Sequence, residues 1–266
     1  MVIVKADQPI GDYWMRSDNQ NACAATTQAL DIKGIVRYVG SSGATPTTTG
    51  YNYTGECVDE PIESLVPIVA LDATNDDIEF TYDVTVAPNG ASPNLFKWYL
   101  SGTTFESQYG DPTLVHLIEN GTLPTYSGNL ILDIPDNEWV YVIVESGIPV
   151  PHPVHLHGHD FHILAEGAGS FDSSVVLNLK NPARRDTALL PAAGYIVLAF
   201  QTDNPGAWLM HCHIGWHVSM GFALQIVEQK SKIPSTVADT CVLKNTCSTW
   251  GNYATANDIK VLDSGV

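Results

Sequence analysis

Short segments in which apolar and polar residues alternate, the pattern of half-buried β-strands, recur along the chain. In the clearest of them, apolar residues occupy every second position from Ile78 to Val86. Runs that are apolar at nearly every position are typical of strands covered on both faces, and they occur at 130–132, 140–144, 196–200 and 222–227. No long amphipathic helix and no alternation of strands with helices is predicted. The pattern indicates an all-β Greek-key sandwich.

The two ends of the chain have different patterns. Residues 1–40 contain two predicted strands, 13–16 and 35–39, and residues 41–66 form a predicted linker rich in Ser, Thr, Gly and Pro. The main domain is predicted over 67–228. The remaining tail, 229–266, turns to Ser, Thr, Ala and Asn, with a short helix expected within 235–249.

Charge and length narrow the possible functions. The chain has 266 residues, enough for one large or two ordinary domains. Its 29 acidic and 12 basic residues give a net charge of −17, which argues against nucleic acid or an anionic membrane as a partner. No apolar run is long enough to span a bilayer. The first residues lack the basic head and apolar stretch of a signal peptide, so we expect the chain to begin inside a domain.

Histidine and cysteine gather in two short segments, 152–157 and 211–217. In the second, His211 and His213 share one face of a predicted strand, and Cys212 takes the other because successive side chains alternate. His217 follows on the next turn and can swing back beside Cys212. The segment therefore predicts a thiolate on one side of the backbone and two imidazoles on the far side.

The segment 152–157 repeats this arrangement, with His155 and His157 on one face and His152 just upstream. Together the segments predict a trigonal set of His152, Cys212 and His217, the ligands of a blue copper centre. Four imidazoles remain for a second metal cluster: His155, His157, His211 and His213. Zinc also binds cysteine and histidine, but a zinc site would not need a cysteine between two histidines of the opposite face. The isolated histidines are predicted to be surface or hydrogen-bonded core residues: His116, His159 and His162.

These segments closely resemble the third and fourth copper-binding motifs of laccases, a class of multicopper oxidases. The motifs are His-Pro-Val-His-Leu-His-Gly-His from His152 and His-Cys-His-Ile-Gly-Trp-His from His211. The resemblance is strongest to the ascomycete fungal type and runs through nearly the whole chain. It implies that the sandwich is a cupredoxin fold, the third laccase domain, and that residues 1–40 are the closing part of a second cupredoxin domain.

The resemblance also implies a role for each ligand. His155 would bind the type 2 copper, and the type 3 pair would be bound by His157, His211 and His213. The family's axial position falls on Phe222, which cannot coordinate, so we expect a three-coordinate type 1 centre of high potential. Met220 lies two residues earlier and is expected to fill a gap in the core rather than to coordinate.

The implied activity is one-electron oxidation of phenols or aromatic amines, coupled to reduction of oxygen to water. The electron would enter at His217 and pass through Cys212 to His211 and His213. The complete oxygen-reducing cluster needs eight histidines and this chain supplies four. We therefore expect the C-terminal portion of a laccase, with an N-terminal laccase domain supplying the other four histidines.

Two other functions have to be weighed against this one. An electron-transfer or copper-storage cupredoxin without oxidase activity would use the blue site, but it has no need of four further histidines. Oxidases that build the cluster between identical two-domain chains need both pairs of His-x-His motifs in each chain, which this sequence lacks.

The resemblance places further residues around the site. Five fall where the family lines its substrate cleft, although such residues also fill cores: Phe96, Trp98, Ile148, Val150 and Trp216. Asp160 either orients a ligand imidazole or is an exposed or strand-capping aspartate. The last four residues, 263–266, either resemble the C-terminal plug of ascomycete laccases or form a frayed end.

The other cysteines and two sequons favour a secreted glycoprotein. Four cysteines besides Cys212 allow three disulfide pairings. The resemblance implies the pair Cys23–Cys57. It also implies that Cys247 would bond to a cysteine of the first domain, which is absent here, so we expect Cys247 to be free, bonded to Cys241 or bonded to another chain. Glycosylation sequons occur at Asn52 and Asn120.

Overall fold

The computed structural model describes residues 3–25, 27, 32–51, 55–74, 79–90, 92–126 and 130–259. The chain divides into two compact units, 1–58 and 59–266. The finer division into four parts predicted from the sequence stays a prediction. Ile78, the sequon at Asn52 and the segment 263–266 lie outside the described residues.

The first unit contains a two-stranded antiparallel sheet. Strand β1 (Asp12–Arg16) pairs with β2 (Lys33–Arg37), close to the strands predicted at 13–16 and 35–39. The ammonium of Lys33 lies 4.3 Å from the centroid of the Trp14 ring, a cation–π contact across this pair. Cys23 and Cys57 form a disulfide.

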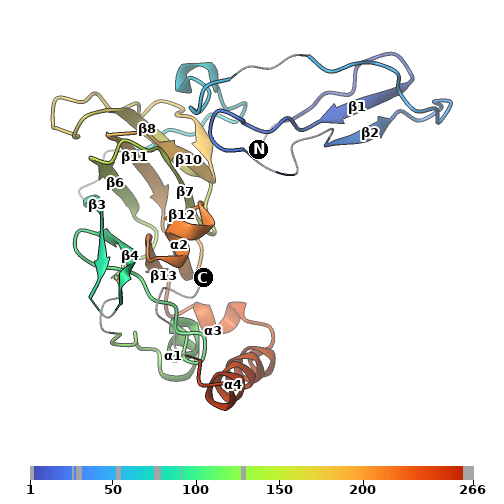
Figure 1. The fold of residues 1–266 in the computed structure, drawn as a ribbon. Coiled ribbons are helices and arrows are strands. Elements are labelled where there is room, and N and C mark those ends of the chain that lie inside the picture. Colours follow the sequence, from blue (N-terminus) through green and yellow to red (C-terminus); the bar gives the residue numbers. More distant parts are fainter. Residues whose placement is uncertain are drawn as a thin grey trace. The chain divides into compact units, whose positions relative to one another are not determined.

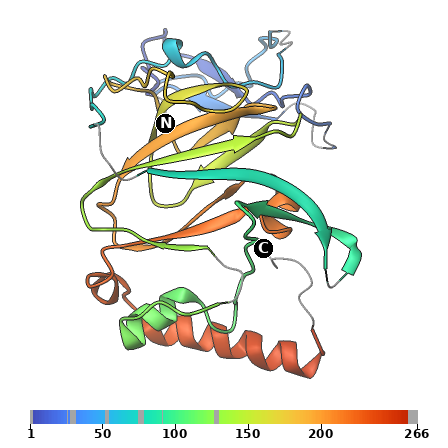
Figure 2. The same cartoon turned by 90° about the vertical axis from the view of Figure 1, so that its left-hand side faces the viewer.

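The second unit is a sandwich of two sheets (Figures 1 and 2). The six-stranded sheet has the order β4-β3-β6-β11-β8-β9. Its strands are β3 (Glu79–Asn89), β4 (Ser92–Leu100), β6 (Trp139–Ser146), β8 (Phe161–Ala168), β9 (Arg184–Arg185) and β11 (Gly194–Gln201). The five-stranded sheet has the order β10-β7-β12-β13-β5. Its strands are β5 (Ile131–Asp133), β7 (His152–Leu156), β10 (Thr187–Leu190), β12 (Gly206–Cys212) and β13 (Ala223–Glu228). The all-β prediction is confirmed.

The core lies between the two sheets, and the central strands β6 and β11 are covered on both faces. Val142 and Leu198 point into the main core, whereas Ile143 and Val197 belong to a second buried cluster on the outer face. All four are at most 1% exposed. This double burial explains why these strands are apolar at nearly every position rather than alternating.

Helices cover one end of the sandwich (Figure 2). The helical elements of the unit are η1 (Ile62–Ser64), α1 (Thr113–Asn120), α2 (Gly215–Ser219), α3 (Ile233–Thr236) and α4 (Thr240–Ala256). The tail helix predicted within 235–249 is correct in type but begins and ends later. Asp239 caps α4 by accepting hydrogen bonds from the backbone N–H groups of Cys241 and Val242, which sets its first turn. None of the helices in the described part of the chain is both long and apolar enough to cross a membrane.

We expect one buried histidine of the fold to make the free energy of unfolding depend on pH. His162 lies on β8 with its ring 5.1 Å from that of Trp139. Burial, and next the positive charge of Arg184, hold the pKa of His162 below 6.5. The unfolded chain therefore binds more protons than the folded chain below about pH 6.5, so the free energy of unfolding should fall as the pH falls through this range.

We expect a His162→Leu chain to lose less stability than the wild type between pH 7.5 and pH 5. One proton accounts for up to about 1.4 kcal/mol per pH unit. Chemical denaturation of both chains at each pH measures their free energies of unfolding. The difference between the two chains cancels the contribution of all other histidines. His116→Leu is the control. In contrast to the buried His162, His116 is half-exposed, and its Nε2 lies 2.8 Å from Asp111 Oδ1. Parallel pH profiles for His162→Leu and the wild type would contradict the prediction.

Candidate metal centre

Strands β7 and β12 lie side by side and carry most of the predicted ligands. They pair antiparallel, with His211 opposite His155 and Cys212 opposite Val154. Along β7 burial alternates, so His152 faces the core and His155 the opposite side. Cys212 is likewise fully buried, and His211 is half-buried on the other face of β12. The alternation predicted from the sequence therefore sorts these ligands into two groups on opposite faces of one sheet.

The inner group consists of His152, Cys212 and His217. The two Nδ1 atoms are 3.2 Å apart, and the Cys212 Sγ lies 4.0 Å from His152 Nδ1 and 3.5 Å from His217 Nδ1. His217 reaches the cysteine because the short helix α2 turns the chain back after residue 214. All three ligand atoms thus converge on one point, as a trigonal metal site requires.

The protonation states of this group suit a metal ion. Burial lowers the pKa of His152 to about 4, with a smaller effect of His217, and burial also lowers the pKa of His217. Both rings are therefore neutral near pH 7 and keep a lone pair for coordination. Burial raises the pKa of the Cys212 thiol to about 12, so a bound cation would be needed to hold it as thiolate. The donor set and its spacing fit copper.

Two aromatic rings, those of Trp98 and Phe222, pack against the inner group. The Trp98 ring lies 4.3 Å from that of His217 and 5.0 Å from that of His152. Phe222 is 2% exposed and its ring is 5.3 Å from His152, so an apolar side chain borders the group. Met220 is half-buried, and its carbonyl accepts a hydrogen bond from the Trp98 N–H. Its expected packing role stays a prediction.

The outer group contains three of the four remaining histidines. His155, His157 and His211 each offer a ring nitrogen within 4.8 Å of the others. The Nε2 atoms of His157 and His211 are 3.1 Å apart. His213 is not part of this group, although its ring lies 5.7 Å from that of His211 and 5.8 Å from that of His155. β12 ends at Cys212, so strand alternation no longer determines the position of His213.

Backbone carbonyls orient two of these rings. His155 Nδ1 donates to the Asp186 carbonyl at 2.6 Å, and His211 Nδ1 donates to the Cys212 carbonyl at 2.9 Å. Each Nε2 is then left as the lone-pair nitrogen for a metal. Burial lowers the pKa of His211 to about 4 and also lowers that of His157, so both can coordinate while neutral. The contact with Asp186 was not predicted. Every residue has a backbone carbonyl, so the sequence does not indicate which one a histidine contacts.

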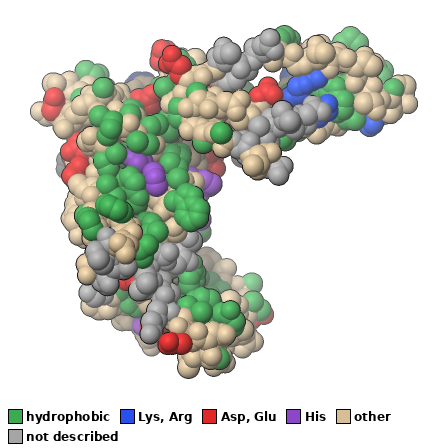
Figure 3. All heavy atoms as spheres, viewed as in Figure 1, with side chains coloured by type: hydrophobic (Ala, Val, Ile, Leu, Met, Phe, Trp, Pro, Cys, Tyr) green, Lys and Arg blue, Asp and Glu red, His purple; other side chains and the backbone are tan. Residues whose placement is uncertain are grey.

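The surface near the sites is partly apolar. Figure 3 shows histidine side chains among hydrophobic ones on the face over β12 and α2. Three of the five predicted cleft residues are exposed, with Trp216 at 79%, Phe96 at 55% and Val150 at 45%. Ile148 and Trp98 are half-buried. Their assignment to a substrate cleft stays a prediction.

Two of the other predicted residues are exposed: Asp160, and Asn120 at the end of α1. The expected role of Asp160 stays a prediction. Cys241 and Cys247 lie on α4, and neither forms a disulfide within the described chain.

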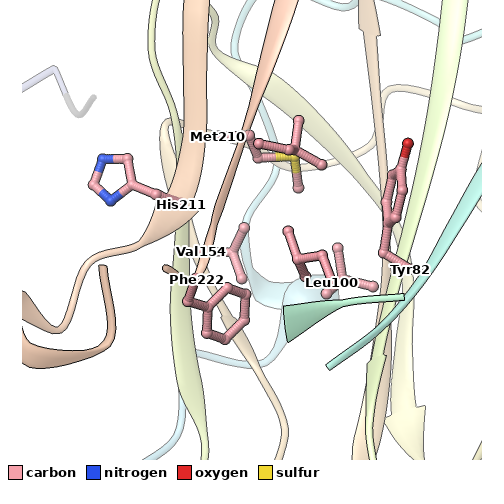
Figure 4. Close-up of a pocket in the computed structure, with 8 residues that line it drawn as sticks. Tyr82, Leu100, Val154, Met210, His211 and Phe222 are labelled. Carbon is pink, nitrogen blue, oxygen red and sulfur yellow. The ribbon is translucent and has the colours of Figure 1, made fainter. Parts of the chain in front are cut away.

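A small apolar cavity of about 10 Å³ lies in the core near the inner group (Figure 4). Val154, Leu100, Phe222 and Met210 line it, and the imidazole of His211 points away from it. Its volume is about that of one water site. The cavity is therefore a gap in packing and not a place for a substrate.

Comparison with known proteins identifies the family. A sequence model described as multicopper oxidase matches residues 98–232. The chain is 42% identical over 272 residues to "Laccase-1" of Botryotinia fuckeliana and 35% identical over 287 residues to the laccase of Cryphonectria parasitica, and it covers 47% and 48% of these proteins. The crystal structure of the laccase from Botrytis aclada superposes with a TM-score of 0.77 and 36% identity over 98% of this chain and 48% of that one.

The chain belongs to the multicopper oxidases, and the predicted resemblance to fungal laccases is confirmed. The likeness to the Botrytis aclada structure also confirms the cupredoxin fold. Copper is the metal of this family, in agreement with the donor set of the inner group. The chain spans about half the length of the relatives it matches.

Proposed function

We propose that this chain is the part of a laccase that holds the blue copper and half of the oxygen-reducing cluster. The observation that carries the proposal is the position of Cys212. It joins an inner His2Cys group to the outer histidines through the backbone of one strand, β12. A protein that needed only one metal site would have no use for ligands on both faces of this strand.

Each group of residues has a distinct task in this proposal. His152, Cys212 and His217 hold the type 1 copper, His155 the type 2 copper, and His157, His211 and His213 the type 3 pair. Copper bound there supplies one-electron oxidation at the inner site and dioxygen reduction at the outer one. The His211 Nδ1–Cys212 carbonyl hydrogen bond adds a second short connection between the groups, parallel to the covalent one.

The substrates proposed are phenols and aromatic amines. His217 is half-buried, and its ring lies 4.3 Å from that of Trp98 at an interplanar angle of 36°. Exposed apolar side chains such as Trp216 and Phe96 offer a surface on which an aromatic ring can stack. The non-coordinating Phe222 beside His152 supports a high reduction potential for the inner copper.

Four further histidines must complete the outer cluster. They are proposed to come from an N-terminal laccase domain, either joined to this chain or in a separate chain. The alternative of a cupredoxin that only transfers electrons is not favoured, because it leaves the outer histidines without a task. An extracellular location is proposed from the Cys23–Cys57 disulfide and the secretion typical of fungal laccases.

A visible spectrum and an oxygen electrode test the proposal together. We expect the copper-loaded chain to show an intense thiolate-to-copper band in the visible range. The same sample should consume no oxygen with a phenol as reductant, because half of the outer ligands are absent. A colourless loaded chain would rule out the blue site. Oxidase activity of the chain alone would show that the outer cluster does not need the four further histidines.

A further inference from the structure

A buried hydrogen-bonded pair that neither metal group uses joins the turn after β7 to β13. The turn consists of His157, Gly158 and His159, and it leads into β8. His159 Nε2 donates to Glu228 Oε1 at 2.5 Å, and the side chains are 6% and 0% exposed. Glu228 is the last residue of β13. A carboxylate this deeply buried is tolerated only with good hydrogen-bond partners, so the pair ties the turn firmly to β13.

A third residue closes these contacts into a ring. The second carboxylate oxygen of Glu228 accepts from the backbone N–H of Asn204 at 3.2 Å. The Asn204 side-chain amide then donates to the carbonyl of Gly158 at 2.9 Å. Trp208 Nε1 donates to the Asn204 carbonyl at 2.8 Å, so β12 also joins the ring. Gly158, His159, Glu228 and Asn204 therefore hold one another in a fixed arrangement.

Packing around Gly158 restricts the backbone conformation of this turn. Gly158 has φ +78°, in the left-handed region, and a Cβ there would lie 2.7 Å from the Trp208 ring. On the other side of the turn, the His157 N–H donates to the Leu209 carbonyl at 2.9 Å. The backbone of His157 is thus fixed at both of its ends.

The side chain of His157 depends on this support. Its ring is exposed, and the His211 Nε2 that lies 3.1 Å away would turn to a metal once one is bound. The position of the His157 backbone then sets the direction of its ring toward the outer group. His159 cannot take the place of a ligand, because its Nε2 is occupied by Glu228 and its ring is buried 5.0 Å from that of Phe200.

We infer that His159, Glu228 and Asn204 are positioning residues that aim His157 at the outer metal cluster. The inference rests on the proposed outer copper site. The ring of contacts includes none of His152, Cys212 and His217, so its loss acts on the outer site and spares the inner one. The inner site thereby serves as a reference within the same molecule.

Two substitutions of His159 distinguish the loss of its hydrogen bond to Glu228 from the general effect of replacing the imidazole ring. Glutamine can place an amide N–H where Nε2 donates, whereas the shorter asparagine can place one only where Nδ1 lies. Cu²⁺ is titrated into the full 266-residue chain against a competing chelator, and the visible band reports the inner site separately. We expect His159→Asn to weaken the binding of outer copper about tenfold or more, with the band unchanged. His159→Gln should retain most of the affinity.

A second variant covers the case in which His159→Asn does not fold. Asn204→Ala removes the bond to the Gly158 carbonyl and leaves the buried pair intact, and it should weaken the outer copper in the same direction. His116→Asn is the matched control, because His116 lies on α1 and forms a partly exposed pair with Asp111, and its replacement should change neither site. Thermal unfolding of each variant without metal measures the cost to the fold.

The outcomes distinguish the inference from the function on which it rests. Wild-type chain that binds no copper beyond the inner site would overturn the proposed outer site and this inference with it. Wild-type chain that binds outer copper, with His159→Asn and Asn204→Ala binding it equally well, would overturn the inference alone. Equal losses in His159→Gln and His159→Asn, or loss of the visible band in step with the outer copper, would also overturn it.

Discussion

We expect the Cys212→Ser chain, loaded with copper, to have no intense visible band. The hydroxyl of serine is a poor ligand for copper and cannot give the thiolate-to-copper transition. Cys212 is fully buried in the main core. The new hydroxyl would therefore also be buried away from water, which lowers the free energy of unfolding by about 1–3 kcal/mol in the metal-free chain.

Cys241→Ser is the matched control for this experiment. Cys241 is an exposed cysteine on α4 without a disulfide partner in the described chain, and its replacement should leave both band and stability unchanged. Absorption spectra and urea unfolding of the two variants measure both effects. A band that persists in Cys212→Ser at full strength would exclude Cys212 as the thiolate ligand.

The second large effect is expected at Gly221, next to the axial position. Gly221 has φ +103°, and a Cβ there would lie 2.0 Å from Thr104 Oγ1, 3.1 Å from the Trp98 carbonyl oxygen and 3.2 Å from the Phe105 carbonyl oxygen. Left-handed strain costs about 1–3 kcal/mol and overpacking about 1–3 kcal/mol more. Gly221→Ala should therefore lower the free energy of unfolding by about 2–6 kcal/mol.

The same substitution should alter the inner copper site. The Cys212 N–H donates to the Phe222 carbonyl and the Phe105 N–H to that of Gly221, both at 3.1 Å. A shift at residue 221 therefore moves Phe222 relative to the copper ligands, and we expect the visible band to shift or weaken.

Two further chains test the cause. Gly215→Ala is the control, because a Cβ at Gly215 meets no atom within 4 Å, and its stability should change by less than about 0.5 kcal/mol. Adding Thr104→Ala to Gly221→Ala removes the closest contact and should recover part of the loss. If the double variant recovers no stability, the whole loss is due to the positive φ of residue 221. If Gly221→Ala is as stable as the wild type, the predicted steric clash of its Cβ is wrong.

The strand pattern and the two-sided placement of the ligands could be predicted, because both follow from side-chain alternation. β7 and β12 bury every second residue in their ligand-bearing parts, so His152 and Cys212 reach the inside while His155 and His211 reach the outside. Local periodicity was also sufficient for the central strands β6 and β11.

Contacts between distant residues could not be predicted in the same way. Glu228 lies 69 residues from His159, and nothing in either neighbourhood marks them as partners. His213 follows the end of β12, where periodicity gives no position. Helix α1 was missed because its eight residues come between strands and no side chain caps its first turn.

The direct pairing of His155 with His211 in the β7–β12 ladder has a consequence for how this protein can vary. The strand-borne ligands of the inner group, His152 and Cys212, and those of the outer group, His155 and His211, lie on opposite faces of the same two strands, so their separation is the thickness of one sheet. Inserting or deleting a single residue within either strand would turn its ligands to the wrong face. Changes in loop length outside these two strands do not alter the distance between these four ligands. Variation that tunes their chemistry is therefore confined to substitutions around them, at positions such as Trp98 and Phe222.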